Sequence, residues 1–211
     1  MEQADTKTRL LNAAERLFSQ QGFANTTMRA ITSLAEANLA AVNYHFGSKE
    51  DLLQAVLERR LLPLNQLRRE RIEQTLADAR ESGRLPRVEA LLRAFIEPTM
   101  AFRCQQSGSR DFVTLIGRAL NSADLAVRER FLALVRPLFE SWHQALCLAL
   151  PQHPPELILT RLFFAMGAIG HCLCFGGLDQ FPHLTACDEG EEDVLCEQLI
   201  TFVTAGLEAP C

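Results

Sequence analysis

The sequence predicts an all-α protein, with a small helix-turn-helix domain at the N-terminal end and a larger helical domain after it. Apolar residues recur at spacings of three and four along most of the 211-residue chain, which is the periodicity of amphipathic helices. No stretch shows the alternation of apolar and polar residues that is typical of half-buried strands. Near the N-terminal end, two short amphipathic segments are separated by a tight turn, which is the pattern of a helix-turn-helix.

The first two helices are predicted from their apolar faces and from the residues at their ends. The first helix is expected over residues 5–21, and Gly22 supplies a stop. Its inward residues are Leu10, Leu11, Ala14, Leu17 and Phe18. The second helix begins after Thr26 or Thr27, because either threonine can cap it. Its inward residues are expected to be Met28, Ile31, Leu34 and Ala35.

The third helix follows a turn at Ala37 and Asn38 and divides into a buried and an exposed side. Its core-facing residues by spacing are Leu39, Val42 and Phe46. The residues left on the outward side are Ala40, Ala41, Asn43, Tyr44 and His45. A second short helix with polar and aromatic residues on its outer side is suited to the major groove of DNA.

A long fourth helix and five further helices complete the prediction. Ser48 and Asp51 have capping-box spacing, and Pro63 is expected to end or kink the helix that follows. Helical character resumes to about Arg80, and residues 82–86 form a linker. The later helices are expected at about 86–104, 110–121, 124–150, 155–176 and 191–208. The predicted domains are residues 1–53 and residues 54–211.

The helix at 155–176 is apolar almost all round, so it must be buried on more than one side. Burial in a subunit interface is the economical explanation in a chain of this size. The helix at 191–208 has an apolar stripe that could join it. Two such helices from each of two subunits would form a four-helix contact in a homodimer.

Charge and composition do not oppose binding to nucleic acid. The net charge is −5, but residues 1–71 hold ten basic and eight acidic residues, so the acidic excess lies in the rest of the chain. No run of 18 residues is free of charge, and no membrane-spanning helix is predicted. Residues 1–7 lack the apolar core of a secretion signal, so the expected location is the cytoplasm.

Residues 8–57 resemble the DNA-binding domain of the TetR family of bacterial regulators. The resemblance rests on Leu17, Phe18, Gly22 and Phe23, on the Thr-Thr-x-Arg-x-Ile pattern at 26–31, and on the Tyr-His-Phe-x-Ser-Lys-Glu-x-Leu pattern at 44–52. It implies a dimeric, ligand-responsive transcriptional regulator that is a repressor by default and has no catalytic activity. Ala40, Ala41 and Asn43 stand where many members have Gly, Thr and Tyr, which is similar to a fatty-acid-responsive branch of Pseudomonas-type bacteria.

The predicted partner is double-stranded operator DNA. The predicted contact residues are Thr26, Thr27, Arg29, Asn38, Ala40, Ala41, Asn43, Tyr44, His45 and Lys49. Asn43 can pair with a base edge, most naturally adenine. Lys49 is placed for a phosphate, as in the family. Tyr44 has the alternative of half-buried packing. A two-fold dimer would place two recognition helices about 34–36 Å apart on an approximate palindrome.

A small apolar or amphipathic effector is the second predicted partner. The candidate pocket residues are Phe95, Met100, Phe102, Phe112, Leu115, Ile116, Phe139, Trp142, Phe163 and Met166. Aromatic residues and Met at helical spacing are also typical of plain core. Arg118, Arg136 and Arg161 lie in apolar helices, where one of them could pair with an effector carboxylate or phosphate, or each could pair with an acidic side chain.

Metal binding or thiol redox sensing is the alternative function. His171, Cys172 and Cys174, with His183 and Cys187 downstream, supply imidazole and thiol groups, but the spacing is not that of a structural zinc site. The odd count of seven cysteines opposes a disulfide framework. An enzyme is a weaker alternative still, because no catalytic motif is present and the pair His143 and Cys147 lacks an orienting group. No cofactor is predicted.

Overall fold

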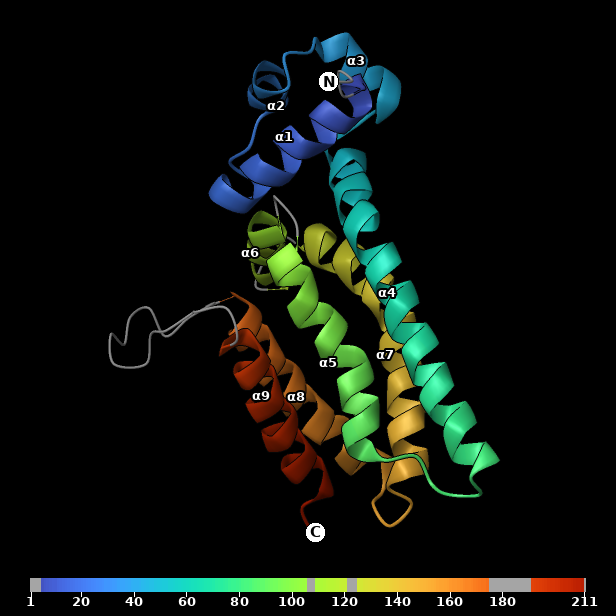
Figure 1. The fold of residues 1–211 in the computed structure, drawn as a ribbon. Helices are drawn as coiled ribbons and strands as arrows, with labels where there is room; N and C mark the ends of the chain where they lie inside the picture. Colours follow the sequence, from blue (N-terminus) through green and yellow to red (C-terminus); the bar gives the residue numbers. More distant parts are fainter. Residues whose placement is uncertain (1–4, 106–108, 121–124, 175–190, 211) are drawn as a thin grey trace, which may run out of the picture. The chain divides into compact units, whose positions relative to one another are not determined.

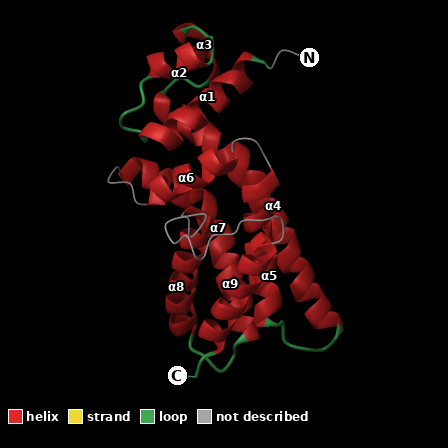
Figure 2. Cartoon of the chain, turned by 60° about the vertical axis from the view of Figure 1, so that its left-hand side comes forward, coloured by secondary structure: helices red, strands yellow, loops and turns green. Residues whose placement is uncertain are grey.

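The computed structural model describes residues 5–105, 109–120, 125–174 and 191–210, and all regular structure in these ranges is helical (Figures 1 and 2). The all-α fold class is therefore confirmed. The helices are α1 (Thr6–Gln21), α2 (Met28–Leu34), α3 (Leu39–His45), α4 (Lys49–Glu81), α5 (Val88–Gln105), α6 (Ser109–Leu120), α7 (Leu125–Ala149), α8 (Pro155–Cys174) and α9 (Glu191–Glu208). None of the described helices is long and apolar enough to cross a bilayer.

The chain divides into two compact units. The first contains residues 1–63 and 105–135, and the second contains residues 64–104 and 136–211. The helix-turn-helix therefore shares a unit with α6, which packs on α1. A boundary between independent domains at residues 53 and 54 stays a prediction. Of the three boundaries in the structure, those at 63/64 and 135/136 fall inside α4 and α7, so each unit contains part of both helices, and the one at 104/105 falls at the end of α5.

Helix α1 has nearly the predicted limits, and Asp5 is its N-terminal cap residue. Leu10, Ala14 and Phe18 are fully buried. The helix ends where Gly22 takes a φ of 81° and its N–H donates to the Phe18 carbonyl, a conformation that glycine adopts without strain. Helix α1 packs on α2, α3 and α6, so it is the central element of the first unit.

A buried ionic cluster fastens α1 to α4. The Glu15 carboxylate is almost wholly buried and pairs with Arg59 and with Arg60, the latter at 2.9 Å. Arg59 also donates to the Asn12 side chain at 2.8 Å. A buried carboxylate is stable only when its charge is paired and its lone pairs are hydrogen-bonded. Glu15 therefore fixes the position of α1 against the first turns of α4.

Helices α2 and α3 are each only two turns long, and side-chain caps start both. The Thr27 hydroxyl accepts from the Ala30 N–H at 3.1 Å, which selects Thr27 over Thr26 as the cap. The predicted inward positions of Leu34 and Leu39 are wrong, since these side chains are 45% and 46% exposed. Each lies at the very end of its helix, where no further turn covers it. Ile31 and Val42 are fully buried and anchor the two helices.

Helix α4 begins as predicted but does not end at Pro63. Ser48 and Asp51 form the capping interaction, in which the Ser48 hydroxyl accepts from the Asp51 N–H at 3.0 Å. The turn before it contains Gly47 with a φ of 80°, again a conformation suited to glycine. The helix continues through Pro63 to Glu81. Pro63 is exposed, so the carbonyl that is left without its helical hydrogen bond has access to water.

The second unit is organised around Trp142 of α7. Its ring is fully buried and stacks on Phe95 of α5, with centroids 4.0 Å apart. The indole N–H donates to the Leu91 carbonyl at 3.0 Å. Helices α8 and α9 pack on each other. Arg161 of α8 donates to the carbonyls of Leu207 and Pro210 at 2.9 and 3.1 Å, so it caps the C-terminal end of α9 and is not placed for an effector.

Replacing Glu15 should destabilise the protein. We expect Glu15→Ala to lower the free energy of unfolding by about 2–3 kcal/mol, because it leaves two arginines without their buried partner. Their side chains are 25% and 15% exposed, which keeps the cost below that of a fully buried pair. Urea unfolding followed by circular dichroism measures the change. The exposed neighbour Arg16 is the control, and an equal loss for Arg16→Ala would contradict the role of Glu15.

Removing the side-chain cap of α3 should cost less stability than replacing Glu15. Asn38 accepts from the Ala41 N–H at 2.7 Å, so Asn38→Ala should cost about 1 kcal/mol of stability. Asn43 is exposed on the same helix, and Asn43→Ala should stay within about 0.5 kcal/mol of the parent. Equilibrium unfolding of both variants tests the difference. Equal stabilities would show that the Asn38 side chain does not cap α3 in solution.

Candidate functional site

Helix α3 presents a row of uncommitted side chains on the surface of the first unit. Val42 is fully buried and holds the helix in place. Ala40 and Asn43 are exposed, and Tyr44 is 85% exposed. This exposure excludes half-buried packing of Tyr44. Its ring meets the His45 ring within the same helix edge-on, at a centroid distance of 5.1 Å. Such a side chain contributes little to folding, and it is available to a partner.

The start of α3 adds a polar group to this surface. Asn38 is exposed, and its Oδ1 atom is used in the cap, so its amide N–H groups point away from that bond. Ala41, one turn later, and His45 are half-buried. Small residues at the first turn let a ligand approach the backbone closely. The N-terminal end of a helix also carries partial positive charge, which favours anions such as phosphate.

The residues before and within α2 divide between structure and surface. Thr26 is buried, and its hydroxyl lies 2.8 and 3.2 Å from the carbonyl oxygens of Gly22 and Leu17, to which it donates. The predicted DNA contact of its side chain is therefore corrected, since that hydroxyl closes the loop after α1. Thr27 and Arg29 are exposed at the start of α2. Sequence spacing alone could not distinguish the two neighbouring threonines.

Lys49 is the first residue of α4. Its ammonium group sits 4.3 Å from the centre of the Phe23 ring, a cation–π contact that limits the movement of a long side chain. A cation at this end of a helix is not favoured by the helix dipole. A phosphate at this position would instead be attracted both by the ammonium charge of Lys49 and by the partial positive charge at the N-terminal end of α4.

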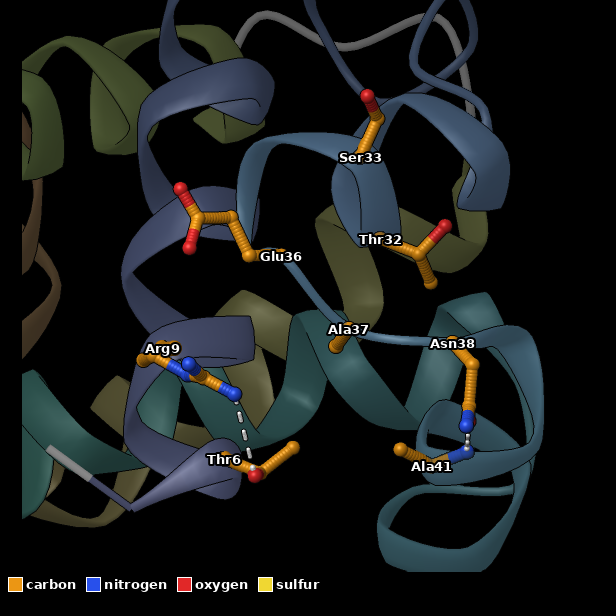
Figure 3. Close-up of a pocket in the computed structure, with 8 residues that line it drawn as sticks. All are labelled: Thr6, Arg9, Thr32, Ser33, Glu36, Ala37, Asn38 and Ala41. Carbon is orange, nitrogen blue, oxygen red and sulfur yellow. Dashed lines mark hydrogen bonds between the residues drawn. The ribbon is translucent and has the colours of Figure 1, made fainter. Parts of the chain in front are cut away.

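An open depression of about 410 Å³ adjoins the start of α3 (Figure 3). Its walls come from α1, α2 and the turn into α3, with the lining residues Thr6, Arg9, Thr32, Ser33, Glu36, Ala37, Asn38 and Ala41. Arg9 contacts the Thr6 hydroxyl at 3.4 Å, and its Nε has no hydrogen-bond partner among the described residues. Sequence reasoning missed Thr6 and Arg9, because the only signal was a cation beside the polar face of the first helix.

The predicted effector residues are divided between the two units. Phe112, Leu115 and Ile116 belong to the first unit, and the other seven belong to the second. Phe95, Met100 and Trp142 are part of the buried core of the second unit, against which Phe139 and Met166 pack. Phe102 is half-buried. Phe163 is 62% exposed, and its place in an effector pocket stays a prediction. At several of these positions, the apolar spacing in the sequence corresponds to packing in the core.

The arginines suggested for an effector anion also have other surroundings. Arg136 is exposed, and Arg161 caps α9. The side chain of Arg118 lies outside the described residues. Arg68 of α4, in contrast, is buried in the second unit with only 6% of its surface exposed. Nothing in the sequence pattern indicates this burial, because Arg68 stands in a run of charged residues that looks solvated.

Two of the described thiols, Cys147 and Cys196, have a raised pKa, which is the opposite of an activated thiol. Burial raises the pKa of Cys147, and Glu156 adds to the increase. Burial also raises the pKa of Cys196, with Glu97 and Glu197 contributing, to about 11. The Cys147 sulfur is 3.5 Å from His143 Nε2, yet this thiol stays protonated at neutral pH, unlike a nucleophile.

The residues suggested for a metal lie only partly within the structure. His171 is exposed and Cys172 is half-buried. The side chain of Cys174 and both His183 and Cys187 lie outside the described residues. Where the structure describes the chain, it shows no group of three or more His, Cys, Asp or Glu residues that could hold a metal ion.

Curated relatives match between a quarter and a third of the chain. The regulator UidR of Escherichia coli (strain K12) is 42% identical over 52 residues, which are 25% of this chain and 26% of UidR. The repressor NicS of Pseudomonas putida is 41% identical over 66 residues, 31% of each chain. The chain therefore matches less than a third of the length of these relatives.

Solved structures share the fold over almost the whole chain. FadR, a fatty acid degradation regulator from Bacillus halodurans, has a TM-score of 0.72 with 11% identity and covers 99% of both chains. NalD, the secondary repressor of a multidrug efflux pump in Pseudomonas aeruginosa, has a TM-score of 0.68 with 23% identity over 95% of this chain and 96% of its own. Identities this low establish the fold alone.

Two family models match the chain. Residues 10–56 match the bacterial regulatory proteins of the tetR family. Residues 93–206 match the tetracyclin repressor-like C-terminal domain, a segment longer than half of the chain. With the helix-turn-helix and the exposed surface of α3 in place, these matches show that the protein belongs to the TetR family of DNA-binding transcriptional regulators.

Proposed function

We propose that this regulator is a dimeric repressor that binds an approximately palindromic operator and is released by a small apolar or amphipathic effector. The observation that carries the proposal is the exposed surface of α3, where the side chains of Asn43 and Tyr44 have no structural task. In a protein that regulates transcription from DNA, a surface of this kind is explained by base contacts in the major groove.

The proposed interface separates base contacts from phosphate contacts. Asn43 is suited to pair with a base edge, with Ala40 and Ala41 close to a thymine methyl. Tyr44 and His45 donate to phosphates or bases. The residues that fix the backbone of the DNA are Thr27, Arg29, Asn38 and Lys49, and the depression containing Arg9 extends their surface. Phosphate contacts set the register while base contacts select the sequence.

Dimerisation is proposed through α8 and α9, which lie side by side in Figure 1. Both helices carry large apolar side chains on their outer surfaces. The exposed fractions are 62% for Phe163, 73% for Phe164, 59% for Val194 and 70% for Phe202. Several exposed phenyl rings in one helix pair are unusual for a monomer and typical of an interface. A two-fold dimer would then place two copies of α3 about one DNA turn apart, at about 34–36 Å.

The effector is proposed to bind in the second unit and to have an apolar body. FadR of Bacillus subtilis, which shares the fold with a TM-score of 0.70 and 12% identity over 94% of this chain and 98% of its own, was solved in complex with stearoyl-CoA. The fold thus accommodates stearoyl-CoA in that protein. The residues Ala40, Ala41 and Asn43 of α3 are similar to those of a fatty-acid-responsive branch of the family. This similarity supports a fatty acid or an acyl derivative as the effector. The ligand need only prefer one of two operator-reading states, typically by about 1–3 kcal/mol.

The DNA interface is tested by substitutions on α3, which should lower the affinity for the operator without changing the stability of the protein. An operator is first obtained by selection from random duplexes with the purified protein. Asn43→Ala should then lower the affinity by roughly tenfold or more, because a good base contact is worth about 1–3 kcal/mol, and Tyr44→Ala should weaken binding as well. Undiminished affinity in both variants would show that α3 does not enter the groove.

The salt dependence of binding tests the proposed role of Lys49 at a phosphate. Lys49→Gln should reduce the slope of log affinity against log salt by about 0.9 for each phosphate that the protein no longer neutralises, thus roughly 2 in a dimer. Arg84→Gln removes a charge from an exposed position in the loop after α4 and is the matched control. Equal slopes for the parent and Lys49→Gln proteins would remove Lys49 from the interface.

The assembly is tested by charges placed on the outer surface of α8 and α9. Phe164→Glu combined with Phe202→Glu should shift the protein from dimer to monomer in sedimentation velocity and reduce operator binding, because buried unpaired carboxylates oppose association. Leu62→Glu on α4 changes a side chain that is 53% exposed and should leave the dimer intact. A stable dimer of the double variant would place the interface elsewhere.

A further inference from the structure

Arg68 is the most buried arginine of the described residues and is held by neutral groups. Its Nε donates to the Thr99 hydroxyl oxygen at 3.1 Å, and one Nη atom donates to the same oxygen. The other Nη donates to the Asn65 side-chain oxygen at 2.9 Å. The central carbon of the guanidinium group lies over the Phe95 ring, 4.3 Å from its centre. Helices α4 and α5 thus position this cation from both sides.

The position of the guanidinium group is fixed in advance. The Thr99 hydroxyl donates its own hydrogen to the Phe95 carbonyl at 2.8 Å. Both of its lone pairs are therefore directed to Arg68, and they accept from two different nitrogens. A guanidinium group has five N–H donors, and the described residues accept from three of them. Two N–H groups, one on each Nη atom, remain for another acceptor.

No carboxylate of the described residues lies within ion-pair distance of Arg68. Two other arginines near this region are paired with carboxylates. Arg71, one turn further along α4, pairs with Glu97 at 2.9 Å, and Arg93 pairs with Glu89 and Glu97, each at 3.0 Å. Burial lowers the pKa of Arg68 to about 9, so the group is still charged at neutral pH. A buried charge without a counter-ion is unfavourable, and its retention points to an anion that comes from outside the chain.

We infer that Arg68, oriented by Asn65 and Thr99, binds the anionic head of the effector, which makes that effector an amphipathic acid. The inference rests on the proposed function, which it deepens by naming the chemistry of the ligand. A carboxylate or a phosphate would accept from the two remaining N–H groups side by side, the bidentate geometry that arginine favours.

The experiment compares three ligands that differ only at the head: dodecanoate, dodecyl phosphate and 1-dodecanol. Binding to the delipidated, purified protein is measured by calorimetry, and release of the selected operator by fluorescence anisotropy. We expect at least tenfold tighter binding of one or both anions than of the alcohol. A preference for dodecanoate identifies a carboxylate as the natural head, and a preference for dodecyl phosphate identifies a phosphate.

Two variants separate the anion site from a structural role. Arg68→Met should unfold at the same or a higher temperature and lose the preference for anions over the alcohol. Arg71→Met, which removes an exposed arginine one turn away, should keep that preference. Arg68→Lys should retain it in part, because the charge remains but the bidentate geometry does not.

The outcomes distinguish the inference from the function on which it rests. If all three ligands bind equally and release the operator, the effector proposal stands and the anion site is overturned. If Arg68→Met keeps the preference for anions, the site is likewise overturned. If none of the ligands binds or releases the operator while the operator itself is bound, the amphipathic effector fails and the inference fails with it. Loss of folding in Arg68→Met together with an unchanged preference in Thr99→Val would make Arg68 a structural residue.

Discussion

The ion cluster of Glu15 with Arg59 and Arg60 is the interaction on which the proposed DNA-binding surface depends. Helix α1 is the support of the first unit, since α2, α3 and α6 all pack on it. Glu15 joins this support to the beginning of α4, where Lys49 is found. The ion cluster therefore links the helix on which α2 and α3 pack to the N-terminal part of α4.

The two short helices illustrate how little core a recognition surface needs. Val42 is the only fully buried residue of α3 among those described, and the Asn38 cap and the Gly47 turn fix where the helix begins and ends. Because few side chains of α3 are used in packing, Asn43 and Tyr44 stay available to DNA. Exposed side chains add little stability to α3, so the helix depends on Val42, on the Asn38 cap and on the turn at Gly47.

Periodicity is sufficient to predict the helices and their order, but it cannot predict which end residues are covered. Leu34 and Leu39 follow the apolar pattern and are nevertheless exposed, since burial at a helix end depends on the neighbouring chain. The exposure of Asn43 and Tyr44 follows from the spacing around a buried valine. The role of Thr26 does not, because a threonine that closes a loop and one that caps a helix look alike in sequence. The burial of Arg68, where α4 faces α5, likewise depends on packing and cannot be predicted from the sequence pattern.

The site proposed at Arg68 and the cluster at Glu15 involve the same helix. Arg59 and Arg60 precede Arg68 on α4 by about two turns, with Pro63 between them. An anion bound at Arg68 would neutralise a buried charge and so change the preferred packing of α4 on α5. A ligand needs only a differential affinity for two such arrangements to change operator binding.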